Sequence, residues 1–71
     1  MSQPVCMSIR YKVVGGCEGE DLCTSEDDAR EVLKKILDEY VQRGHHVVTM
    51  GDEYIVEDRG GYLVATYELI H

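Results

Sequence analysis

The chain has no tryptophan, no phenylalanine and only one proline among its 71 residues. Five tyrosines supply all of its aromatic surface, and each brings a hydroxyl that needs water or a hydrogen-bond partner. Basic residues are also few, since seven Lys and Arg stand against 14 Asp and Glu, for a net charge of −7. This deficit argues against direct binding to nucleic-acid phosphates or to an anionic membrane surface. It suits a protein that needs the charge for solubility alone, or one whose partner is basic.

Two kinds of segment are also missing from the sequence. No stretch is apolar for long enough to span a membrane, and the N-terminal residues lack the basic and apolar regions of a signal peptide. The three cysteines are an odd number, which argues against a disulfide framework. We therefore expect one small domain, residues 1–71, in the cytoplasm, where thiols stay reduced.

One amphipathic helix is predicted between Thr24 and Gly44. Its apolar residues recur at steps of three and four, which places them on one face. They are Ala29, Val32, Leu33, Ile36, Leu37, Tyr40 and Val41. Thr24 or Ser25 is expected to cap the start, and Gly44 suits the left-handed residue beyond the end. A lone helix with one apolar face must bury that face against a sheet.

The rest of the sequence reads as strands and turns. Alternating apolar and polar residues predict a first strand over residues 5–14, and residues 15–23, rich in glycine and acids, read as a loop. After the helix, residues 46–50, 54–57 and 62–70 read as strands, although 46–57 also fits one bent strand with a bulge at Gly51. We predict an α+β fold: one helix packed on a mostly antiparallel sheet of three or four strands. The first strand and the strand after the helix would form a right-handed crossover if they were parallel neighbours.

The last predicted strand is apolar on both faces. Leu63, Ala65, Tyr67 and Leu69 form one set. Tyr62, Val64 and Ile70 lie on the other, and a single helix covers only one face of a sheet. An uncovered apolar surface usually marks a contact with another chain, so these three residues are the predicted self-association surface of a homo-oligomer.

Acidic residues are concentrated before and within the start of the helix. Glu18, Glu20, Asp21, Glu26, Asp27 and Asp28 fall in a segment without Lys or Arg. The last three also complement the helix dipole. The segment lacks the alternating oxygen ligands of a calcium loop. We predict an acidic patch that meets a basic protein surface, with solvated surface charge as the alternative.

Cysteines and histidines supply the ligand types of a zinc site, but not its spacing. Cys17 and Cys23 bracket five residues, whereas structural zinc sites present closely spaced pairs. Acidic neighbours of Cys23 oppose a reactive thiolate. His45 and His46 follow the helix, where the dipole stabilises a protonated imidazole. We expect no metal, no cofactor and no catalytic residue.

The order of strand, helix and two further strands resembles that of dodecins, which are small oligomeric flavin binders. The chain lacks the tryptophan expected to stack on a flavin. In size and charge it resembles inhibitors encoded by phages and mobile elements, including anti-CRISPR proteins and DNA mimics. We predict a non-enzymatic, homo-oligomeric protein-interaction module that inhibits a basic, nucleic-acid-binding protein. The alternatives are a ligand binder with Tyr54, Tyr62 or Tyr67 lining a cavity between subunits, and a Cys/His metal or thiol redox protein.

Overall fold

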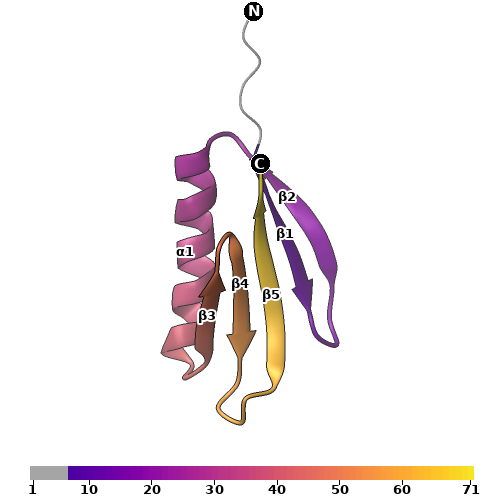
Figure 1. The fold of residues 1–71 in the computed structure, drawn as a ribbon, viewed down its shortest axis with the longest axis vertical. Helices are drawn as coiled ribbons and strands as arrows, with labels where there is room; N and C mark the ends of the chain where they lie inside the picture. Colours follow the sequence, from indigo (N-terminus) through magenta and orange to yellow (C-terminus); the bar gives the residue numbers. More distant parts are fainter. Residues whose placement is uncertain (1–6) are drawn as a thin grey trace, which may run out of the picture.

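The computed structural model describes residues 7–71, which form one helix against a five-stranded sheet (Figure 1). The elements are β1 (Met7–Val13), β2 (Glu18–Cys23), α1 (Glu26–Gln42), β3 (His46–Met50), β4 (Glu53–Glu57) and β5 (Leu63–Ile70). The sheet order is β2-β1-β5-β4-β3, and every neighbouring pair is antiparallel. The predicted α+β class is confirmed, but the predicted three or four strands are wrong, because the sheet has five. No helix within residues 7–71 has the length and apolar character needed to cross a membrane.

The additional strand is β2, in the segment predicted to be a loop. Glycine and acidic residues have low strand propensity, so this segment carries little strand signal of its own. It pairs in register with β1, and Lys12 opposes Glu18 while Arg10 opposes Glu20. Opposite charges across antiparallel strands stabilise the pairing. The partner strand, rather than local propensity, makes residues 18–23 a strand.

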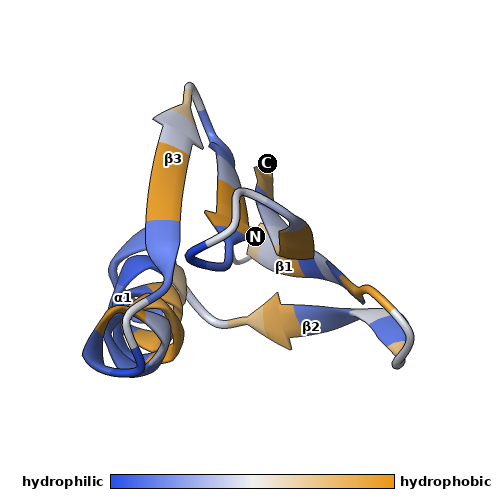
Figure 2. Cartoon of the chain, turned by 90° about the horizontal axis from the view of Figure 1, so that it is seen from below, coloured by the Kyte–Doolittle hydropathy of each residue, from blue (hydrophilic) through white to orange (hydrophobic). Residues whose placement is uncertain are grey.

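The helix connects the two outermost strands, β2 and β3 (Figure 1). In consequence β1 and β3 are not neighbours, and the parallel crossover considered from the sequence is not formed. The extra strand before α1 also departs from the dodecin-like order. A view from below shows α1 lying against one side of a curved sheet, with β2 and β3 at its two margins (Figure 2). The other side is called the open face below.

The core lies between α1 and the inward residues of the three central strands. Its buried apolar members are Met7, Ile9, Ala29, Leu33, Val56, Ala65, Tyr67 and Leu69. Within the described residues, the buried apolar members from β1 and from β5 each belong to one alternating set, but Leu63 of the β5 set is 48 % exposed. The predicted residues Val5 and Cys6 lie outside the described residues. The helical stripe is narrower than predicted, because Val32 is 36 % exposed and Val41 is 55 % exposed.

Both ends of the helix have the predicted capping residues. The Asp28 backbone N–H donates to the Ser25 hydroxyl at 3.1 Å, so Ser25 is the N-cap. Gly44 follows the last turn with a φ of +89°, and its N–H donates to the Val41 carbonyl at 3.0 Å. The turn after β3 is a hairpin with Gly51 at a φ of +61°, which excludes the single bent strand over residues 46–57.

Tyr67 is the most buried of the tyrosines in the described residues, at 7 % exposed. Its hydroxyl lies 3.2 Å from that of Tyr40 on the helix, so the two tyrosines satisfy each other's polar ends across the core. Burial, followed by this hydrogen bond, raises the pKa of Tyr67 well above its ordinary value of 10.0. The neutral phenol is therefore the form that the fold accommodates.

This raised pKa predicts a specific weakness at alkaline pH. Below the ordinary pKa of 10.0 Tyr67 is neutral in both states, but above it the unfolded chain releases a proton that the folded chain retains. Stability should then fall as the pH rises from 10.0 toward the folded pKa. Urea denaturation at about pH 9 and about pH 11 should show a smaller fall for Tyr67→Phe than for the natural protein. Tyr62→Phe, at a residue 74 % exposed, is the matched control and should behave like the natural protein.

Candidate functional site

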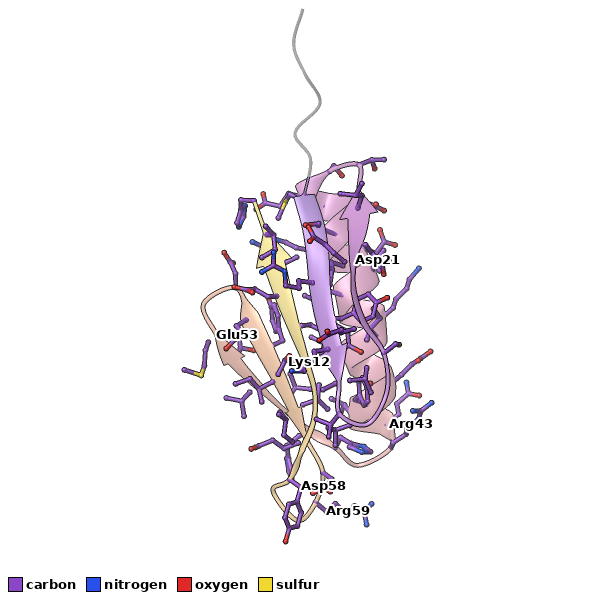
Figure 3. All side chains as sticks on the ribbon, turned by 90° about the vertical axis from the view of Figure 1, so that its right-hand side faces the viewer. Lys12, Asp21, Arg43, Glu53, Asp58 and Arg59 are labelled. Carbon is purple, nitrogen blue, oxygen red and sulfur yellow. The ribbon has the colours of Figure 1, made fainter. Side chains whose placement is uncertain are left out.

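The predicted acidic residues are divided by the pleat of β2. Side chains alternate between the two faces of a strand, so Glu18 and Glu20 lie on the open face and Asp21 on the side of α1. Figure 3 looks onto the sheet from the β2 side and shows Asp21 between β2 and the helix. The six acids therefore do not form one continuous patch. Three lie on the two faces of β2, and Glu26, Asp27 and Asp28 lie in the first turn of α1.

On the open face, basic residues of β1 accompany the acids. Glu20 accepts one hydrogen bond from the buried Ser8 hydroxyl, and its other carboxylate oxygen lies 3.8 Å from the Arg10 guanidinium. Lys12 is opposite Glu18 in the register. Glu53 and Glu68 face each other across β4 and β5. These charged side chains, together with Tyr11, Gly19 and Thr66, line a hollow of about 520 Å³, and Figure 3 shows Lys12 and Glu53 on this side.

The basic residues Arg10 and Lys12 and the buried Ser8, which accompany these acids, were not predicted from the sequence. In the sequence, Arg10 and Glu20 stand equally far from Gly15 on either side, and so do Lys12 and Glu18. This symmetry about a turn is the signal of a charged hairpin. Neither strand reveals it when taken alone, because the pattern depends on the register between them.

On the side of α1, the end of β2 and the start of the helix bring carboxylates together. Burial, then the negative charges of Asp28 and Asp21, raise the pKa of the Cys23 thiol. Both effects favour the neutral thiol of Cys23 over its thiolate. Glu26 lies 3.3 Å from Arg30 on the next helical turn, so part of its charge is compensated within the helix.

Four of the six predicted acids form no ion pair within residues 7–71: Glu18, Asp21, Asp27 and Asp28. The first two lie on β2, which is the outermost strand on its side of the sheet. An outermost strand directs alternate backbone N–H and C=O groups away from its neighbour. The β2 edge therefore combines open backbone hydrogen-bonding groups with carboxylates on both faces: Asp21, and Glu18, which lies across from Lys12 without forming an ion pair.

The predicted self-association residues lie on or beside a central strand. Val64 and Ile70 are half-buried on the open face of β5, which pairs with β1 on one side and β4 on the other. Tyr62 precedes the strand and is 74 % exposed. Because β5 has no free edge, its residues could contact another chain only through a face of the sheet.

The cysteines and histidines of the described residues do not converge. Cys17 and Cys23 flank the extended β2 strand, which separates them by about 20 Å at the usual rise per strand residue. A disulfide between them would require β2 to unfold. His71 instead lies 2.9 Å from Asp52 at the β3–β4 turn. Within residues 7–71, no three His, Cys, Asp or Glu side chains are arranged to hold a metal ion.

The three tyrosines considered for a ligand cavity are also dispersed. Tyr67 is buried beneath α1, and Tyr54 pairs with it in the register on the same side of the sheet. Tyr54 borders a hollow of about 220 Å³ beside the helix, which Tyr62 does not line.

A search against protein-family models, curated proteins and solved structures finds no match to this chain.

Proposed function

We propose that this chain is a non-enzymatic protein-interaction module that binds a basic segment of another protein along the β2 edge. The observation that carries the proposal is the open edge of β2, where Glu18 and Asp21 present carboxylates on opposite faces and neither forms an ion pair within residues 7–71. An extended segment that joins such an edge gains main-chain hydrogen bonds, and its side chains alternate between the two faces. Lys or Arg at successive positions would then meet acids on both faces.

Charge complementarity supports this choice of partner. The net charge of −7 attracts basic segments over distance and repels nucleic acids. Basic segments of this kind are common in nucleic-acid-binding proteins. A module that occupies such a segment would exclude the nucleic acid from it, so we propose inhibition of a nucleic-acid-binding protein as the biological consequence.

The test uses a ten-residue probe peptide of alternating lysine and threonine, with a glutamate-for-lysine peptide as its control. We expect the basic peptide to bind, and the double variant Glu18→Lys/Asp21→Lys to weaken binding about tenfold or more, because each reversal replaces attraction with repulsion. Glu39→Lys reverses an exposed helical charge and should change affinity far less per charge. Fluorescence anisotropy measures the affinity at low salt and in about 0.5 M salt.

Backbone amide shifts in NMR spectra locate the peptide. We expect the largest amide shifts in residues 18–23 and a marked loss of peptide affinity at high salt. Affinity that is unchanged in about 0.5 M salt contradicts the charge argument, since exposed ion pairs are screened at that concentration. Shifts that are confined to β3 or to the C-terminal end of α1 contradict the assignment to β2.

A further inference from the structure

The second open edge of the sheet, β3, differs from β2 in its chemistry. Its five residues, His46–Met50, include no Asp, Glu, Lys or Arg. Val48 is 42 % exposed and Met50 is 60 % exposed. Figure 2 shows the apolar part of β3 at the margin of the sheet. Edge strands usually carry charges, prolines or bulges that prevent pairing with another chain, and β3 carries none of these.

The two edges also differ in how they would meet a second copy of the chain. Pairing β2 with itself would bring Glu18, Glu20 and Asp21 of two copies together, and like charges on neighbouring strands are destabilising. Pairing β3 with itself brings no charged strand residues together. Like-charge repulsion therefore disfavours pairing of β2 with a second copy of β2, but it does not disfavour pairing of two β3 strands.

The residues that flank β3 favour an antiparallel arrangement. Arg43 precedes the strand, and Glu53 and Asp52, which also lies beside His71, follow it. Antiparallel pairing places the start of one strand beside the end of the other. Each basic flank would then lie next to an acidic flank of the second copy, whereas parallel pairing would set like charges side by side. The charges that flank β3 thus favour a second copy of the chain as the partner, and antiparallel pairing of the two strands.

We propose that two copies of this chain associate through antiparallel pairing of their β3 strands, centred on Val48. Two five-stranded sheets then become one continuous sheet with a two-fold axis perpendicular to it. Both helices lie on the same side, and Val48 meets the partner's Val48 on the open face as a cross-strand pair. The two β2 edges remain free at the far ends, so the dimer does not depend on the proposed function of β2.

Sedimentation equilibrium between about 10 µM and about 1 mM protein tests the pairing, since dimers form by mass action. We expect the natural protein to be dimeric and Val48→Lys to raise the dissociation constant at least about tenfold, because two lysines would face each other at the centre. Leu22→Lys is the matched control: it lies on the open face of the other edge and is 80 % exposed. It should leave the dimer intact.

A second measurement does not depend on any variant. Hydrogen exchange of the β3 amides in the natural protein should slow as the concentration rises over the same range, while exchange of the β2 amides should not. A monomer at about 1 mM overturns the proposal, as does an oligomer that survives Val48→Lys in folded protein or dissociates only with Leu22→Lys. A monomeric Val48→Lys variant that still binds the basic peptide separates this proposal from that for β2.

Discussion

Replacement of Leu33 by alanine is expected to destabilise the fold by about 2–5 kcal/mol. Leu33 is 2 % exposed and belongs to the core cluster that joins α1 to the sheet. Truncation removes buried methyl groups and leaves a cavity that the short helix cannot fill by collapse. A chain of 71 residues has a total free energy of unfolding of about 4–10 kcal/mol. The loss is thus a large fraction of the whole.

Val41→Ala is the control for this experiment, because the sequence placed Val41 on the same apolar stripe. Val41 is 55 % exposed, and alanine has the higher helix propensity, so we expect a change within about 0.5 kcal/mol. Urea denaturation followed by circular dichroism at one protein concentration measures both variants. Similar losses of unfolding free energy in the two variants would mean that Val41 is buried like Leu33. They would contradict the narrow contact between the helix and the sheet.

Gly44→Ala is expected to destabilise the fold by about 1–3 kcal/mol. Gly44 has a φ of +89°, which disfavours any residue with a Cβ atom. An added Cβ would also lie 2.6 Å from the Arg59 guanidinium, which packs over this position. Figure 3 shows Arg43 and Arg59 at the same end of the molecule, where the helix ends. The substitution therefore combines backbone strain with displacement of a side chain.

Gly61→Ala separates the two contributions. Gly61 has a similar φ of +83°, but nothing lies within 4 Å of an added Cβ there. Its loss of stability should reflect backbone strain alone, at about 1–2 kcal/mol. Removal of the guanidinium in the double variant Gly44→Ala/Arg59→Ala should bring the loss from Gly44→Ala toward that of Gly61→Ala. Thermal denaturation of all variants measures these losses. If the difference between Gly44→Ala and Gly61→Ala persists in the background without the Arg59 side chain, Arg59 is not the cause of that difference.

The helix and the C-terminal strands were predictable because their signals are local. A cap at Ser25, a stripe at helical spacing and a glycine at position 44 specify α1 without reference to any other segment. Turn residues at positions 51–52 and 58–61 likewise mark the ends of β3, β4 and β5. The exposure of Val41 was not predictable, since it depends on where the sheet ends beneath the helix.

The candidate site was only partly predictable for the same reason. The acidic residues were evident as a cluster in the sequence, but their division between two faces follows from β2 being a strand. The compensation of Glu20 by Ser8 and Arg10 follows from the register with β1. The sequence also placed the self-association surface on the last strand, whereas the open edge that we propose for pairing is β3.

The sequence by itself determined one amphipathic helix, a mostly antiparallel sheet and an acidic surface, because periodicity, capping and net charge are properties of neighbouring residues. The tertiary structure alone decided that residues 18–23 are a strand and that β2 and β3 are the edges. Strand pairing is a contact between distant segments, and a segment poor in strand formers becomes a strand when a complementary neighbour supplies hydrogen bonds and opposite charges. For this protein, those pairings leave one edge acidic and the other uncharged.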